Sequence, residues 1–537
     1  MNGNPRAKVV LIGLDGATFA VLDHLMSDGV MPFLRAWSSG GVRAVLRSTS
    51  HPLTPIAWTT LMTGRQPGNH GVFDFVRADF DGPQPGYVLG TSADVRVETL
   101  WAMASRHGRR VTCLNFPSMF PPPAIDGFVV PGFVPWQYMS RAVHPRDLYA
   151  RLKNLPDFNR KQLALDWDIE RKALQGLSEN EFEDWIQFHT AREAQWFSIT
   201  QFLMREEPCE LTAILFDGVD KLQHLCYHLL DPSLAPRYTS EWALRIRSLC
   251  LDYFRQLDRF IGKIVEAAGH LAQVFIASDH GFHAASDQIF YANVWLEKQG
   301  YFGWKEDAPL DHEGRLTLEG HAGPDTLIDW SRTVAFALTA SSNAIWIRRK
   351  RNGSVGVSDE EYPSVCKRLV DGLTTLTDPV TGERLVQRVM TREEAFPGAA
   401  VNDAPDLTLV LSDYSFLSVL RTDSVVKPRR LPYGTHHPAG IFMAAGSGIR
   451  RGVELAPFSI VDITPTLLHA LELPLSSDLD GAPMTAAFEP SWLAAHPVRY
   501  EKGVEAPVQT SSGPSPSLGN EADHEILRRL KALGYVE

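Results

Sequence analysis

Residues Lys8–Gly16 read KVVLIGLDG, a run of aliphatic, partly β-branched side chains that ends in an aspartate and a glycine. A short continuous apolar run bounded by a turn signal is typical of a strand buried on both faces of a parallel sheet. Such a strand would deliver Asp15 to the carboxyl edge of the sheet. The segment therefore predicts an α/β fold and a first chemical group at its edge.

Similar buried-strand runs recur along the chain, with helical patterns between several of them. Phe19–Gly29 and Met31–Gly41 are predicted helices, and the second opens with a proline and closes at glycines. Strands that alternate with helices favour a mostly parallel sheet with helices on both faces. The other predicted strands are Arg110–Leu114, Leu211–Phe216, Gln273–Ala277, Leu407–Leu411 and Gly440–Ala444.

Two stretches interrupt this rhythm and suggest insertions in a single α/β domain over residues 1–490. The first, at about 117–205, is rich in proline and then helical, and is expected to cap a site. The second, at about 301–403, contains an amphipathic helical pattern at 359–376. Residues 491–537 are predicted to be a linker and a short terminal helix, Glu521–Leu533.

The first insertion also carries aromatic side chains whose role the sequence leaves open. They either line a substrate pocket or form the insertion's own small core, and the second is the commoner use of such residues. These residues are Trp136, Trp167, Trp185 and Trp196.

Composition excludes several classes of protein. The 537 residues carry 52 basic and 63 acidic side chains, a net charge of −11, so no basic surplus indicates nucleic-acid binding. Five scattered cysteines without a CxxC motif argue against a disulfide scaffold or a cysteine zinc site. No signal-peptide pattern or membrane-length apolar run occurs, so we expect a cytoplasmic protein. The oligomeric state stays open.

Acidic and imidazole groups follow the predicted strands at the edge where open α/β sheets bind ligands. Asp15 follows the first strand, and Asp279-His280 follow Gln273–Ala277. Asp220 and His224 follow Leu211–Phe216 and stand four residues apart, which places both on one face of a helix. Aspartate and histidine together suit a zinc-class ion.

Each of these groups also has an ordinary structural explanation. Asp220 and His224 could be a solvated helix face, and an aspartate at a strand end often caps the next turn. The pair His436-His437, in the glycine-flanked loop YGTHHPAG, could be loop histidines. Taken together, the groups favour a metal site.

The region Ser48–Phe75 makes a family resemblance specific. Thr54 lies nine residues before Thr63-Gly64 of the string TGRQPGNHG. This spacing resembles the nucleophile segment of the alkaline phosphatase superfamily. The strings GLDGATF, TPIAWTTLMTG, SDHGF, NVWLEKQGYF and APDLTLVLSDY are similar to its type I phosphodiesterase/nucleotide pyrophosphatase-like branch, which includes predicted bacterial phosphohydrolases and phosphomutases. The resemblance runs from about residue 8 to 490, and includes the tail LRRLKALGYVE.

The resemblance implies an alkaline-phosphatase-like catalytic domain with two divalent metal ions, Zn²⁺ or Mn²⁺. One ion would be held by Asp220, His224 and His436, with His436 rather than His437 matching the family's last ligand. The other would be held by Asp15, Asp279, His280 and the Thr54 oxygen. Thr54 would attack phosphorus to give a phospho-threonine intermediate, which water then hydrolyses.

The sequence departs from two relatives. Sulfatases use a Cys or Ser within C/S-x-P-x-R, whereas this chain has Thr54-Pro-Ile-Ala-Trp58, so sulfate-ester hydrolysis is disfavoured. Nucleotide pyrophosphatases have a phosphate-binding asparagine where this chain has Phe75, after Asp74.

Another residue must then contact the phosphoryl oxygens. Arg65, His70 and Lys221 are the candidates. Their alternatives are a surface charge, a residue that holds its loop by hydrogen bonds, and a side chain in solvent, respectively.

Three functions compete. The leading one is hydrolysis of a small-molecule phosphate ester, either a diester or a monoester. A cofactor-independent phosphomutase would use the same ligands and nucleophile, with the phospho-enzyme shielded from water. A non-catalytic binding protein that keeps the fold is disfavoured because all seven expected site residues are present.

Overall fold

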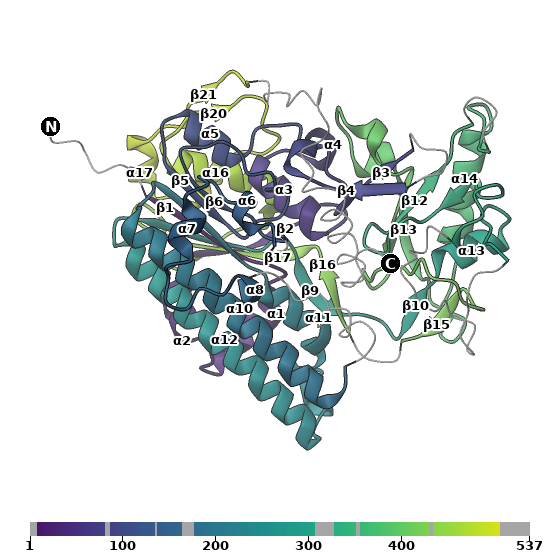
Figure 1. The fold of residues 1–537 in the computed structure, drawn as a ribbon, viewed down its shortest axis with the longest axis horizontal. Coiled ribbons are helices and arrows are strands. Elements are labelled where there is room, and N and C mark those ends of the chain that lie inside the picture. Colours follow the sequence, from purple (N-terminus) through teal and green to yellow (C-terminus); the bar gives the residue numbers. More distant parts are fainter. Residues whose placement is uncertain are drawn as a thin grey trace.

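The computed structural model describes residues 8–80, 86–134, 137–163, 177–306, 327–350, 355–429 and 433–504. A nine-stranded sheet forms the centre (Figure 1). Its strand order is β18-β2-β17-β8-β1-β7-β5-β6, and β19 also pairs with β2. The strands are β1 Val9–Leu14, β2 Val42–Arg47, β5 Val111–Leu114, β6 Gly127–Val130, β7 Leu211–Phe216, β8 Gln273–Ala277, β17 Ala439–Gly446, β18 Val453–Glu454 and β19 Phe458–Ser459.

Strand β1 lies in the middle of this sheet and is buried along its whole length. It runs parallel to both neighbours, β7 and β8. Val10, Ile12 and Leu14 contribute to the core on one face, and Val9 and Leu11 to the core on the other. Alternation along a strand with two apolar faces explains the continuous apolar run in the sequence.

Helices cover both faces of the sheet, as the alternating pattern predicted (Figure 1). One face carries α1 Phe19–Ser27, α2 Pro32–Ser39, α10 Glu179–Glu206, α11 Gly218–Leu230 and α12 Glu241–Ala268. The other carries α3 Thr54–Thr63, α5 Leu100–Arg106 and α16 Ile463–Ala470. Most sheet pairings are parallel, so the predicted mostly parallel α/β fold is confirmed. The exception is β17, which is antiparallel to β2 and β8.

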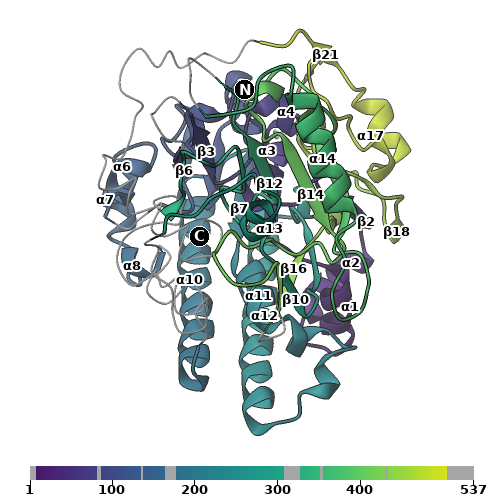
Figure 2. The same ribbon diagram turned by 90° about the vertical axis from the view of Figure 1, so that its right-hand side faces the viewer.

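A second, smaller sheet lies beside the first in Figure 1 and in front of it in Figure 2, with its own hydrophobic core. Its order is β11-β12-β14-β13 and its pairings are antiparallel. The elements are β11 Ala335–Phe336, β12 Ala344–Ile347, β13 Val386–Thr391 and β14 Leu407–Leu411, with helices α13 Ala292–Lys298 and α14 Tyr362–Thr374. The placement of Leu407–Leu411 among the strands of the parallel sheet was therefore wrong. A short apolar run indicates burial but does not say which sheet contains it.

The segment 117–205 is part of the central layer, whereas a separate insertion would lie outside it. Strand β6 pairs with β5 in the main sheet, and α10 packs along α12. Trp185 and Trp196 are buried in the core that α10 shares with the sheet, which favours their core role over a pocket role. Trp136, Trp167 and residues 505–537, which include the predicted terminal helix Glu521–Leu533, lie outside the described residues. Residues 491–504 of the predicted linker are described, and they contain most of α17 Pro490–Ala495 and the strand β21 Tyr500–Glu501, which pairs with β20 Leu475–Ser476.

No helix within the described ranges is long and apolar enough to cross a membrane.

Candidate metal centre and active site

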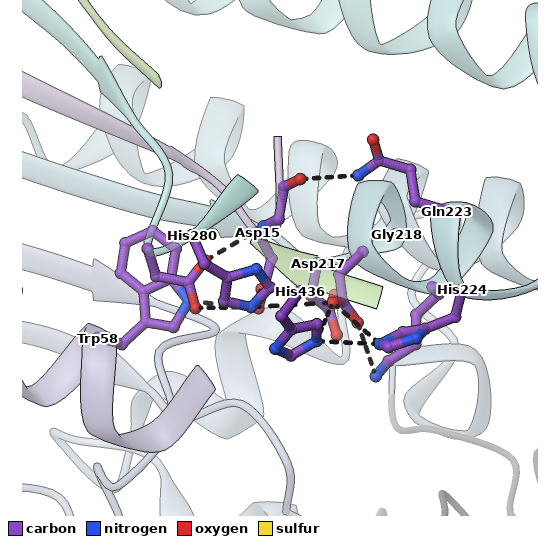
Figure 3. Close-up of polar contacts among 12 residues, drawn as sticks. Asp15, Trp58, Asp217, Gly218, Gln223, His224, His280 and His436 are labelled. Carbon is purple, nitrogen blue, oxygen red and sulfur yellow. Dashed lines mark hydrogen bonds and ion pairs between the residues drawn. The ribbon is translucent and has the colours of Figure 1, made fainter. Parts of the chain in front are cut away.

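Four segments bring polar groups to the carboxyl ends of β1, β7 and β8. Leu14 of β1 is level with Phe216 of β7, and Gly13 of β1 is level with Ala277 of β8. Asp15 and Asp217 therefore leave the sheet side by side, and Asp279 follows β8 after one further residue. Figure 3 shows Asp15 next to His280, and His436 between His280 and His224. The strand-end placement predicted from the sequence is the placement that the structure shows.

Helix α11 begins directly after β7 and carries Asp220 and His224 on one face, as their spacing predicted. His224 Nε2 lies 3.3 Å from Asp220 Oδ1. Asp220 is buried, whereas about a quarter of the His224 side chain is exposed. The placement of both side chains on one helix face, predicted from the i, i+4 spacing, is therefore present.

His436 comes from a separate ribbon that the sequence did not indicate. Strand β16 Gly434–His437 pairs antiparallel with β9 Gly281–Ala284, which follows Asp279-His280 directly. His436 Nε2 lies 3.2 Å from Asp220 Oδ1 and 3.1 Å from His224 Nε2. Since neighbouring strand residues point to opposite faces, His437 turns away. Its Nδ1 accepts a hydrogen bond from the Ala439 N–H, and its ring packs against His283 and Tyr414.

Six of the seven expected ligands thus surround one point, and two overlapping groups can be distinguished. Ligand atoms of Asp220, His280 and His436 lie within 4.8 Å of one another, and so do those of Asp15, Asp279 and His280. His280 Nε2 lies 3.3 Å from Asp279 Oδ2, 3.6 Å from Asp15 Oδ1 and 4.0 Å from Asp220 Oδ1. His280 therefore stands between the two groups, although the family pattern assigns it to one.

The histidine hydrogen bonds fix which nitrogen faces the carboxylates. His436 Nδ1 lies 2.7 Å from the Pro52 carbonyl oxygen, and His280 Nδ1 lies 3.1 Å from that of Gly281. A carbonyl oxygen only accepts, so each Nδ1 carries the proton and each Nε2 presents a lone pair. Burial lowers the pKa of both imidazoles, which keeps them neutral. Lone pairs of neutral histidines therefore face carboxylate oxygens, an arrangement that needs a cation between them.

The carboxyl groups also indicate that the cluster lacks a positive charge. Burial, then repulsion from Asp279 and Asp220, raises the pKa of Asp15 well above its usual range, and burial does the same for Asp279. Burial also disfavours ionised Asp220, but His224 and Lys221 outweigh it and hold its pKa well below the usual range. Within the described residues, Asp15 Oδ1, Asp279 Oδ2 and His280 Nε2 are buried and make no hydrogen bond. These residues fit divalent metal ions.

Thr54 is the first residue of α3 and is buried. Residues on either side of it contact the ligand cluster. The carbonyl oxygen of Pro52 accepts the hydrogen bond of His436, and Trp58, one turn after Thr54, donates from Nε1 to Asp15 Oδ2 at 3.2 Å. Residues i and i+4 share a helix face, so Thr54 lies on the face of α3 that meets the cluster.

Gly16 links three of these segments. Its N–H donates to Asp279 Oδ1 at 3.1 Å, and its carbonyl oxygen accepts from Gln223 Nε2 of α11 at 2.8 Å. Its φ is +66°, and a Cβ there would lie 2.7 Å from the Phe282 ring. Only glycine fits this position without strain.

The structure places the three candidate substrate contacts differently. Lys221 is buried with Nζ 3.3 Å from Asp220 Oδ2, so it lies beside the cluster and not in solvent. Arg65 lies beyond the far end of α3, where it pairs with Asp478 and Asp480, and the structure does not bring it to the cluster.

His70 holds its loop, as its structural alternative proposed. Its Nδ1 accepts from the Val72 N–H at 3.1 Å, and its Nε2 lies 2.9 Å from Thr60 Oγ1. Both ring nitrogens are therefore used within the loop and its helix.

Asp74 is oriented toward the second sheet. Its carboxyl oxygens accept hydrogen bonds from the hydroxyls of Thr339 and Ser341, at 2.5 and 2.9 Å. Asp74, which precedes the position of the family's asparagine, therefore uses its carboxyl group for contacts between the two sheets.

Sequence reasoning missed Trp58, Gly16 and Gln223. Trp58 lies within TPIAWTTLMTG, four residues after Thr54, so its helical spacing could have identified it. Gly16 and Gln223 act through backbone contacts that no spacing shows.

Comparison with known proteins gives an independent view of the same region. The family model for type I phosphodiesterase/nucleotide pyrophosphatase matches residues 9–438. No curated protein matches the sequence. Murine ectonucleotide pyrophosphatase/phosphodiesterase 5 is a similar solved structure, with a TM-score of 0.52 and 14% identity over 90% of this chain and 100% of that one.

A second similar structure is phosphonoacetate hydrolase from Sinorhizobium meliloti 1021 in complex with phosphonoformate. Its TM-score is 0.53, with 13% identity over 88% of this chain and 97% of that one. At these identities the structures show a shared fold, while the family model covers the strands and loops that carry the candidate ligand cluster. The chain belongs to the type I phosphodiesterase/nucleotide pyrophosphatase family and is a phosphoric ester hydrolase of the alkaline phosphatase superfamily.

Proposed function

We propose that this protein hydrolyses small-molecule phosphate esters with Thr54 as the nucleophile, at a site for two divalent ions, Zn²⁺ by preference and Mn²⁺ as the alternative. The observation that carries the proposal is the pair of neutral histidines, His280 and His436, whose Nε2 lone pairs face buried carboxylates. Mixed aspartate and histidine ligands suit these ions.

The proposed ligand sets are those of the family pattern, which adds His224 and Thr54 to the two groups in the structure and assigns His280 to one of them. Asp220, His224 and His436 would hold one ion, and Asp15, Asp279, His280 and the Thr54 oxygen the other. When bound, the ions lower the pKa of the nucleophile and balance charge on the phosphoryl group. His280, which lies between the groups, would set their separation.

Thr54 would use the beginning of α3 as well as its own hydroxyl. The first N–H groups of a helix have no partner within it, and the helix dipole adds partial positive charge there; in α3 these are the N–H groups of Thr54 and Ile56, since Pro55 has none. These groups would bind phosphoryl oxygens while Thr54 Oγ1 attacks phosphorus and the alcohol leaves. Water would then hydrolyse the phospho-threonine and regenerate the hydroxyl.

Lys221 and Trp58 would act on the carboxylates and not on the substrate. Lys221 sits at Asp220 Oδ2, and Trp58 donates to Asp15 Oδ2. Each leaves the other oxygen of its carboxyl group facing the cluster. They would orient the two ligands and restrict their rotation.

Two solved relatives support the substrate class. An inactive threonine-to-alanine variant of the murine protein was solved with AMP, and the Sinorhizobium enzyme with phosphonoacetate. Both ligands present a phosphoryl or phosphonyl group on a small molecule. For this chain we propose the same phosphorus-containing group and leave the alcohol or carbon part undefined.

The test is metal analysis of the purified chain, followed by assays with p-nitrophenyl phosphate and its bis ester. Two equivalents of metal and turnover of one ester are the expected results. A fully metallated protein that turns over neither ester would favour a binding role. Transfer of phosphate from phospho-Thr54 to a sugar phosphate hydroxyl would instead favour a phosphomutase.

A further inference from the structure

We propose that Arg192 and Glu193 of α10 are positioning residues that fix the first turn of α11 and, through it, the ligand Asp220. The inference rests on the proposed metal site and assigns a role to a helix from the segment 117–205. Both residues contact the start of α11, so their effect on Asp220 would pass through that helix.

Arg192 is 1% exposed and contacts three different segments. Its guanidinium pairs with Asp217, the residue between β7 and α11. It also donates from Nε to the Leu163 carbonyl oxygen at 3.2 Å and from Nη2 to Asn115 Oδ1 at 3.4 Å. The planar fork of arginine suits simultaneous contacts in fixed directions.

Asn115 completes the attachment of Asp217 to the sheet. It follows β5, and its Nδ2 donates to Asp217 Oδ1 at 3.1 Å and to the Leu215 carbonyl oxygen at 2.9 Å. Its φ of +65° is one that asparagine adopts more readily than most residues. Asp217 is therefore held from two sides, by the strand next to β7 and by α10.

Glu193 holds the next residue, Gly218, which begins α11. Its Oε1 accepts from the Gly218 N–H at 2.6 Å and from the Tyr253 hydroxyl at 3.4 Å. A Cβ on Gly218 would lie 2.6 Å from both partner oxygens, so the close approach requires glycine. Burial raises the pKa of Glu193 to about 8, with the nearby Asp217 charge adding to it. A neutral glutamic acid is closely matched in shape by glutamine.

Gly218 lies less than one helical turn from the proposed ligand Asp220. Asp220 stands two residues after Gly218 and is the residue that His224, His280 and His436 all approach. A shift of the first turn of α11 would therefore move Asp220 relative to three other ligands, two of which come from different segments.

The experiment compares Zn²⁺ affinity across variants of the metal-free full chain, by titration calorimetry, beside its thermal unfolding. Glu193→Met removes the acceptor at similar volume and is expected to weaken Zn²⁺ binding by about tenfold or more, as loss of outer hydrogen-bond partners does. Glu193→Gln keeps the acceptor and should retain near-normal affinity. Arg192→Lys keeps the charge but loses the fork, and provides a second test if Glu193→Met does not fold.

Thr200→Val is the matched control, since Thr200 is buried in α10 and its hydroxyl bonds only within the helix, to the Trp196 carbonyl oxygen at 2.8 Å. It should leave Zn²⁺ affinity unchanged. If Glu193→Met or Arg192→Lys folds and binds Zn²⁺ like the wild type, the inference is overturned while the proposed function stands. If the wild type binds no Zn²⁺ or Mn²⁺, both fail. If it binds metal but hydrolyses no ester, only the proposed function fails.

Discussion

Trp58 Nε1 donates a hydrogen bond to Asp15 Oδ2 across 3.2 Å, which joins the helix that begins at Thr54 to the carboxylate at the end of the central strand. The indole is fully buried, and a Cβ on Gly13 would lie 2.7 Å from its ring. The ring therefore packs directly on β1. This contact fixes the proposed nucleophile relative to a proposed metal ligand.

Replacing Trp58 by phenylalanine should keep the ring in the core but remove the N–H. We expect metal affinity and kcat to fall by about tenfold, because the carboxylate loses the partner that orients it. Trp101→Phe is the matched control. Trp101 is fully buried in the same core, and its Nε1 makes no hydrogen bond in the part of the chain described. Equal losses in both variants would mean that only packing matters.

His436→Ala should lose bound metal, whereas His437→Ala should keep it. The two side chains lie on opposite faces of β16, and only His436 approaches Asp220 and His224. Loss of one ligand of a mixed site should weaken metal binding by at least about tenfold. Metal content of the two purified variants, measured side by side, decides the assignment. Loss of metal in His437→Ala alone would contradict it.

The positions of the proposed ligands could be predicted because each belongs to a short motif at the end of a strand. Asp15 and Asp279 leave neighbouring parallel strands, so their convergence follows from the sheet. Asp220 and His224 follow from helical spacing. The glycine-flanked loop indicated the pair His436-His437, but the choice of His436 came from the resemblance alone, because the ribbon of β9 and β16 that positions it has no distinctive pattern.

The remaining parts of the site depend on contacts between segments far apart in the sequence. Arg192 and Glu193 lie in a long helix where charged residues usually face solvent, and only the fold shows them buried beside Asp217 and Gly218. Sequence could not place Leu407–Leu411 in the second sheet either, because short buried strands look alike in both kinds of sheet.

His70 should stabilise the fold in a pH-dependent way. Burial, with a smaller effect of the Arg65 charge, lowers the pKa of His70 to about 3. The unfolded chain takes up a proton near pH 6.5 and the folded chain does not. Stability from His70 is therefore present above about pH 6.5 and is lost as the pH falls toward 3, by up to about 1.4 kcal/mol per pH unit.

Urea unfolding of wild type and His70→Gln between pH 4 and 8 would measure this dependence. The variant should be less stable at pH 8 and lose less stability on acidification. The exposed His270 provides the control, since His270→Gln should keep the wild-type slope. An unchanged slope in His70→Gln would show that other groups cause the acid sensitivity. Activity at pH 8 should change little, because both nitrogens of His70 bond within its own loop and helix.

Thr54→Ala should abolish ester hydrolysis while metal binding largely survives. The hydroxyl is proposed as the attacking group, and loss of a nucleophile removes the covalent route, by more than roughly 10³-fold. The other six ligand side chains converge through contacts that do not involve Thr54, so they should still hold metal, though less tightly. The measurement is turnover of an activated phosphate ester beside the metal content of the same preparation.

Thr59→Ala is a control within α3, where a fully buried threonine is changed away from the first turn. Near-normal turnover in Thr54→Ala would mean that water attacks the ester directly, and the phospho-threonine route would then be wrong even though the fold and the metal ligands are unchanged.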